Sequence, residues 1–162
     1  MREMVTLFRK VLFLSALPLF SMGVDFELDS LVSDANKTEK HLLLFLHKDG
    51  CGFCEKMMIN LEDSNISKSI EKDFIFVDIN RDDEETLSFK EYNGTTKTFL
   101  KKLDVDLYPT ILFMNGESTF VYNVIGYRNT KKFSTILNYV KNRTYQSVTF
   151  EEYEDELLTD EE

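Results

Sequence analysis

The two cysteines of the chain lie close together, in the segment Gly50-Cys51-Gly52-Phe53-Cys54. An apolar run, residues 42–46, precedes this segment, and apolar residues at helical spacing follow it. In a strand–turn–helix arrangement, Cys51 would begin the helix, where unpaired N–H groups and the helix dipole favour a thiolate. Cys54 follows about one helical turn later, within reach of a disulfide bond. The pattern predicts a redox-active cysteine pair.

The composition is that of a globular protein. The chain has 162 residues, of which 30% are charged and 43% are hydrophobic, which suits one compact domain. Its net charge of −10 argues against a nucleic-acid partner, because such a partner requires a basic face.

The first 23 residues have the pattern of a signal peptide. A basic segment at residues 2–10 is followed by an apolar segment at 11–20 and by Ser21-Met22-Gly23, which offers small residues for cleavage. The apolar segment is short for a membrane span, so an uncleaved anchor is the weaker alternative. We therefore expect a soluble, exported, periplasmic protein with its main domain at residues 24–146. Residues 147–162 should add a short helix and an acidic tail.

Periodicity predicts alternating strands and helices. Expected helices span residues 25–36, 53–61, 66–72 and 95–103, with a further one beginning at Asn129-Thr130 and a short one within 147–158. Expected strands span residues 42–46, 74–79, 87–92, 110–114 and 118–125, with turns at Asn93-Gly94 and Asn115-Gly116. The strand at 74–79 is apolar on both faces. This order predicts an α/β fold in which helices cover both sides of a mixed central sheet.

Three features resemble the thioredoxin superfamily, over residues 40–142. They are the Cys51–Cys54 pair after a strand, Tyr108-Pro109-Thr110 before a second apolar strand, and Gly126 late in a third. The resemblance implies a thioredoxin fold in which Pro109 is cis and faces the cysteine pair. It is closest to small periplasmic thioredoxin-like proteins of the SoxW type, because residues 81–93 look like their insert before the cis-proline helix.

The resemblance also implies a function, that of a thiol–disulfide oxidoreductase and most specifically a protein-disulfide reductase. Cys51 would attack the substrate disulfide, and Cys54 would resolve the resulting mixed disulfide. Gly50, Phe53, Tyr108, Pro109 and Gly126 would line the substrate groove. We expect a monomer whose partners are protein disulfides and a membrane thiol–disulfide electron donor, with no metal and no cofactor beyond the cysteine pair.

Several other interpretations of the cysteine pair are weaker. A purely structural disulfide closing so small a loop gains little chain entropy. A zinc site needs about four ligands, more than two cysteines and His41 or His47 supply. Covalent haem requires a histidine where Glu55 stands. A disulfide isomerase, an oxidant, or a binding module with little redox turnover remain open.

Two residues near the pair depart from thioredoxin itself. Phe45 stands where thioredoxin carries a buried acid that assists proton transfer to the resolving cysteine, so water or Glu55 would have to serve. His47 is interpreted as a solvated loop residue, although its position four residues before Cys51 would allow it to tune that thiol.

Overall fold

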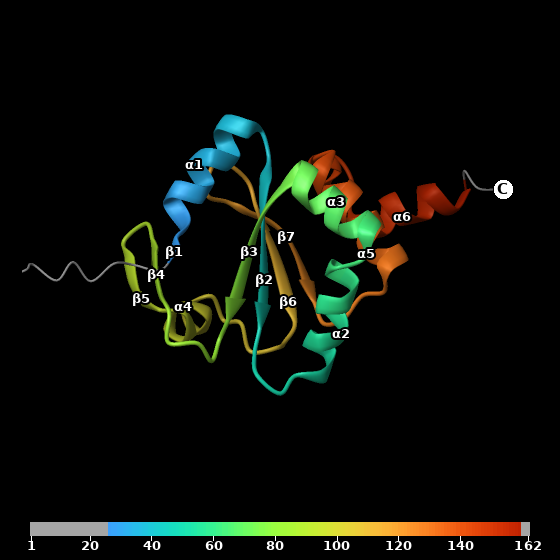
Figure 1. Ribbon diagram of the computed structural model, residues 1–162. Helices are drawn as coiled ribbons and strands as arrows, with labels where there is room; N and C mark the ends of the chain where they lie inside the picture. Colours follow the sequence, from blue (N-terminus) through green and yellow to red (C-terminus); the bar gives the residue numbers. More distant parts are fainter. Residues whose placement is uncertain (1–25, 160–162) are drawn as a thin grey trace, which may run out of the picture.

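A mixed four-stranded sheet forms the centre of the computed structural model, which describes residues 26–159 (Figure 1). The strands lie in the order β3, β2, β6 and β7, which span Phe74–Asn80, His41–His47, Thr110–Met114 and Phe120–Ile125. β2 is parallel to β3 and antiparallel to β6, which is antiparallel to β7. The α/β prediction with a mixed sheet is confirmed. The predicted signal peptide, residues 1–23, lies outside the described residues.

Helices cover both faces of this sheet (Figure 1). On one side lie α1 (Leu28–Thr38) and α4 (Thr96–Lys102). On the other lie α2 (Gly52–Leu61), α3 (Ser64–Asp73), α5 (Thr130–Lys141) and α6 (Phe150–Thr159), with the short 3-10 helix η1 (Thr144–Gln146) between the last two. Asp63, Thr95 and Asn129 cap α3, α4 and α5 by accepting hydrogen bonds from first-turn amides.

Alternate side chains of β2 enter two different apolar cores, because successive residues of a strand point to opposite faces. Leu42, Leu44 and Leu46 pack on the side of α1 and α4. Leu43 and Phe45 pack on the side of α2, α3 and α5. β2 is thus buried on both faces, as its continuous apolar run predicts.

A small second sheet occupies the predicted insert. β4 (Thr86–Phe89) and β5 (Tyr92–Thr95) form a hairpin, and the two-residue β1 (Phe26–Glu27) pairs with β4 in parallel. Asn93-Gly94 was the predicted turn, and this prediction is wrong, because both residues lie within β5. The turn is at Lys90-Glu91, where Lys90 has a φ of 54° and its N–H donates to Asp29 Oδ2 at 2.7 Å.

Two strands also differ from their predicted form. β3 is an edge strand of the four-stranded sheet, so Phe76 is exposed although the sequence suggested apolar burial on both faces. β7 begins at Phe120 instead of residue 118, because the turn after β6 is longer than the predicted Asn115-Gly116. Asn115 Oδ1 accepts from the amides of Glu117 and Thr119 and holds that longer turn.

In the part of the chain that the structure describes, each helix is too short or too polar to cross a membrane.

Candidate active site

Cys51 and Cys54 form a disulfide at the N-terminus of α2. Cys51 is the N-cap residue, and its Sγ accepts a hydrogen bond from the amide of Cys54 at 3.2 Å. The two sulfurs differ in accessibility, since Cys51 is partly exposed whereas Cys54 is 1% exposed. The helix N-terminus favours negative charge on the accessible sulfur. The pair therefore has an outer sulfur able to meet a partner and an inner one that is shielded.

The turn that delivers Cys51 depends on Gly50, whose φ of +63° lies in the left-handed region that glycine adopts at low cost. Beyond Cys51, the side chain of Phe53 is 62% exposed, and the ammonium of Lys56 lies 5.5 Å from the centre of its ring. Both predicted residues therefore lie next to the disulfide, Gly50 in the turn before Cys51 and Phe53 between the two cysteines.

Tyr108, Pro109 and Gly126 lie together at the same end of the sheet as the cysteine loop. Leu46 of β2 pairs with Thr110 of β6, which places Pro109 beside the end of β2. The Tyr108–Pro109 peptide bond is cis, and the Gly126 amide donates to Pro109 O at 2.7 Å. The Lys48 ammonium lies 5.9 Å from the centre of the Tyr108 ring. This contact links the cysteine loop to the wall formed by Tyr108, Pro109 and Gly126.

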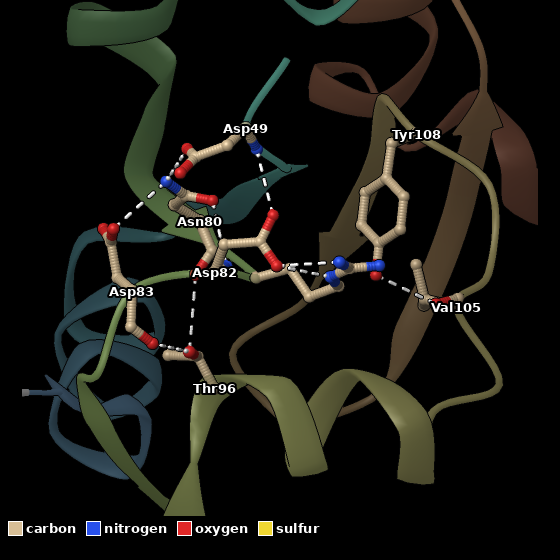
Figure 2. Close-up of polar contacts among 8 residues, drawn as sticks. Asp49, Asn80, Asp82, Asp83, Thr96, Val105 and Tyr108 are labelled. Atoms are coloured by element: carbon tan, nitrogen blue, oxygen red, sulfur yellow. Dashed lines mark hydrogen bonds and ion pairs between the residues drawn. The ribbon is translucent and has the colours of Figure 1, made fainter. Parts of the chain in front are cut away.

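A polar network ties the cysteine loop to the residues after β3 (Figure 2). Asp49 donates its amide to Asp82 Oδ2 at 3.1 Å, and its carboxylate accepts from the Asn80 amide at 2.9 Å. Asp82 also pairs with Arg81 at 2.7 Å, and this hydrogen-bonded guanidinium holds the pKa of Asp82 below its usual range. The Arg81 guanidinium lies 5.8 Å from the centre of the Tyr108 ring. The network thus fixes the loop before Cys51 and the residue before Pro109 relative to one another.

Sequence reasoning missed most of this network. The sequence suggested only an insert at residues 81–93, yet Arg81 and Asp82 join the cysteine loop to Tyr108. Leu107, 64% exposed and two residues before Pro109, was also overlooked. Leu107 could have been predicted as a site residue, because it directly precedes the Tyr108-Pro109 pair in the sequence. The contacts of Arg81 could not, because they depend on tertiary structure.

His47 is not the solvated loop residue that the sequence suggested. It is the last residue of β2, its side chain is 14% exposed, and its Nε2 lies 2.8 Å from Asp78 Oδ1. Its ring stacks on Phe45 with 5.1 Å between ring centres and 19° between planes. The hydrogen bond to Asp78 raises the pKa of His47 above its ordinary value of 6.5, against the opposing effect of partial burial.

Within residues 26–159, no cluster of three or more His, Cys, Asp or Glu side chains is arranged to hold a metal ion.

A disulfide at the N-terminus of a helix, following a central strand and sharing one sheet end with a cis-proline, is typical of thiol–disulfide oxidoreductases. The sequence matches the thioredoxin-like domain family over residues 28–141, and the chain belongs to that family. No curated protein sequence matches the chain significantly.

Solved structures agree on the fold. A thioredoxin-fold protein from Helicobacter pylori is 20% identical with a TM-score of 0.63, over 80% of this chain and 90% of that one. A thioredoxin from Thermus thermophilus is 19% identical with a TM-score of 0.55, over 74% and 88%. The oxidised C-terminal domain of DsbD from Neisseria meningitidis is 16% identical with a TM-score of 0.50, over 71% and 91%. At these identities the likeness concerns the fold alone.

Proposed function

We propose that the protein is a periplasmic protein-disulfide reductase of the SoxW-like type, with Cys51 as the attacking and Cys54 as the resolving cysteine. The observation that carries the proposal is the difference between the two sulfurs. Cys51 is accessible at the N-terminus of α2, while Cys54 is 1% exposed. An accessible thiolate suits attack on a substrate, and a shielded thiol one turn away suits resolution.

The reaction proceeds in two exchanges. The Cys51 thiolate attacks one sulfur of a substrate disulfide, forming a mixed disulfide and releasing the other substrate sulfur as a thiolate. Cys54 then attacks Cys51 Sγ, which forms the Cys51–Cys54 disulfide and releases the second substrate sulfur. Two electrons pass from the cysteine pair to the substrate, and no further cofactor is needed.

The substrate is proposed to lie between the cysteine loop and the wall opposite it. Exposed Phe53 offers an apolar contact on one side. Tyr108, Pro109 and Gly126 supply the other side, and Gly50 permits close approach because it has no side chain. A reductase in an oxidising compartment must be recharged, so we propose a membrane thiol–disulfide transporter as electron donor and a monomer as the working form.

The reduction potential of the Cys51–Cys54 pair tests the direction of the reaction. The protein is equilibrated with mixtures of reduced and oxidised dithiothreitol, and the two cysteine states are separated after alkylation. We expect a potential near that of thioredoxin, about −270 mV. A potential near that of DsbA, about −120 mV, would contradict the reductase and support an oxidant or isomerase.

The Cys54→Ala variant tests the order of the two steps. It should retain a substrate peptide as a mixed disulfide through Cys51, because the resolving thiol is gone. Cys51→Ala is the matched control and should retain none. Failure of Cys54→Ala to form the mixed disulfide would favour a binding module with little redox turnover.

A further inference from the structure

The resolving thiol of this chain is buried, and a buried thiol resists ionisation. Cys54 is 1% exposed on the inner face of α2, in line with the buried residues Met57 and Leu61. Loss of solvent disfavours the thiolate and so slows attack on Cys51. Glu55, which the sequence offered as a proton acceptor, is exposed on a different face of the helix. A proton acceptor on the side of Cys54 that faces the sheet would therefore speed resolution.

Strand and helix geometry place His47 and Cys54 towards the same end of the sheet. The two elements are consecutive and run in opposite directions (Figure 1), and Phe45 shares a core cluster with Met57. From Phe45 to His47 the strand advances by about 6.6 Å, and from Met57 back to Cys54 the helix retreats by about 4.5 Å. Both steps lead towards the same end of the sheet. The stacking of His47 on Phe45 shows that the ring lies on the face that α2 covers.

We propose that His47, oriented by Asp78, accepts the proton of the Cys54 thiol during resolution of the mixed disulfide. This inference rests on the proposed reductase function and deepens it. The Asp78 carboxylate only accepts hydrogen bonds, so the His47 nitrogen that meets it at 2.8 Å, Nε2, carries a proton. The lone pair of the neutral ring is then on Nδ1, which is the atom able to receive a proton.

The step balances without an added reagent. The proton of Cys54 Sγ passes to His47 Nδ1, and the imidazolium formed is paired with Asp78. The Cys54 thiolate then attacks Cys51 Sγ, forming the Cys51–Cys54 bond and breaking the bond between Cys51 and the substrate. The departing substrate thiolate takes up a proton from solvent, to which His47 returns its own.

Acidic groups surround His47 and favour the imidazolium formed in this step. Asp78 on β3 is the nearest, and Asp83 and Asp49 act from the two neighbouring loops. Figure 2 shows Asp49 and Asp83 meeting at the amide of Asn80. Glu27 and Glu85 line the same open groove of about 840 Å³ as His47. The hydrogen bond to Asp78, helped by the charges of Asp78, Asp83 and Asp49, holds the pKa of His47 above 6.5.

A two-phase thiol assay isolates the step. The reduced protein is mixed in a stopped-flow instrument with a symmetrical nitrobenzoate disulfide, each half of which leaves as a coloured thiolate. The first thiolate reports attack by Cys51, and the second reports resolution by Cys54. We expect His47→Gln to leave the first phase within about a factor of two and to slow the second by about 100-fold.

The pH profile gives a readout that a structural role of His47 would not move. In the parent protein the second phase should accelerate as pH rises through the pKa of His47, because only the neutral ring accepts a proton. Asp78→Asn removes the largest cause of the raised pKa, so the inflection should shift to lower pH. Because the Asp78 side chain is 54% exposed, we expect Asp78→Asn to fold. This variant therefore tests the proposal even if His47→Gln does not fold.

Two matched variants serve as controls. His41→Gln removes the other histidine of the chain, at the far end of β2, and Glu55→Gln removes the exposed carboxylate beside Cys54. Both should keep the parent second phase. If the parent releases only one coloured thiolate, the proposed reductase mechanism fails. If it releases two and the His47→Gln and Asp78→Asn profiles match the parent, only the role of His47 is overturned.

Discussion

The two histidines of the chain stand at the two ends of β2, and their environments shift their pKa values in opposite directions. His41 is 2% exposed, and its Nε2 lies 2.9 Å from the hydroxyl of Tyr145. Burial, with a smaller effect from Arg143, lowers the pKa of His41 to about 4. His47 instead has a raised pKa because it pairs with Asp78. The same residue type is held neutral at one end of the strand and poised to gain a proton at the other.

The His41 shift predicts a loss of stability in acid. The unfolded chain takes up a proton near pH 6.5, whereas the folded protein does so only near pH 4. The stability due to neutral His41 is therefore complete above pH 6.5 and falls as the pH drops towards 4, by up to about 3 kcal/mol. Urea unfolding of the parent and His41→Gln at pH 7 and pH 4 measures this term. The variant should lose less stability than the parent over that interval, and an equal loss would contradict the assignment.

Sequence reasoning at this scale succeeded where chemistry is local and failed where a partner comes from another element. The cysteine pair and the glycine before it can be recognised in five consecutive residues. The role of His47 is not, because Asp78 reaches it from the neighbouring strand, opposite Phe45 in the register. The sequence shows that Phe45 replaces the buried acid of thioredoxin. It does not show that His47, two residues later on the same strand, could take over the role of that acid.

At the scale of elements, local signals located helices better than turns. Asp63, Thr95 and Asn129 each cap the helix that follows, because the capping bond forms within one turn. Asn93-Gly94 has the composition of a hairpin turn, yet Asp29 of α1 captures the amide of Lys90 and fixes the turn there. Strand order is also non-local, so the position of β3 at the sheet edge could not be read from its apolar sequence.

The turn between β6 and β7 packs tightly against α1 and predicts a steric penalty. A Cβ at Gly116 would lie 2.6 Å from the Cα of Asn36, which is backbone and cannot move aside alone. Gly116→Ala should therefore lower the free energy of unfolding by about 1–3 kcal/mol, measured by urea titration.

Gly52→Ala is the matched control for Gly116→Ala. Gly52 is the first residue of α2, and a Cβ there would meet nothing within 4 Å. The variant should be neutral or more stable by up to about 1 kcal/mol, because alanine loses less backbone entropy in a helix. Equal behaviour of the two variants would show that the turn can separate from α1 at little cost.

On the scale of the whole molecule, the reactive groups gather at one end of the sheet while two apolar cores fill the space on either side of it. The family match ends at residue 141, before α6 begins at Phe150. Phe150 is nevertheless only 6% exposed, and its ring lies 5.3 Å from that of Tyr139 and 5.8 Å from that of Tyr122. The C-terminal helix is therefore anchored in the same core as α5 and β7.

This anchoring predicts that the stability of the whole domain depends on α6. Phe150→Ala would leave a cavity among Tyr122, Tyr139 and Tyr153, and should lower the free energy of unfolding by about 3–5 kcal/mol. Leu158→Ala, in the same helix but 57% exposed, should change it by less than about 0.5 kcal/mol. Urea unfolding followed by far-ultraviolet circular dichroism compares the two. A single transition that moves to lower urea for Phe150→Ala alone would mean that α6 unfolds together with the sheet. A parent-like midpoint with early loss of helix would mean that residues after 146 are an appendage, because the core would then hold without them.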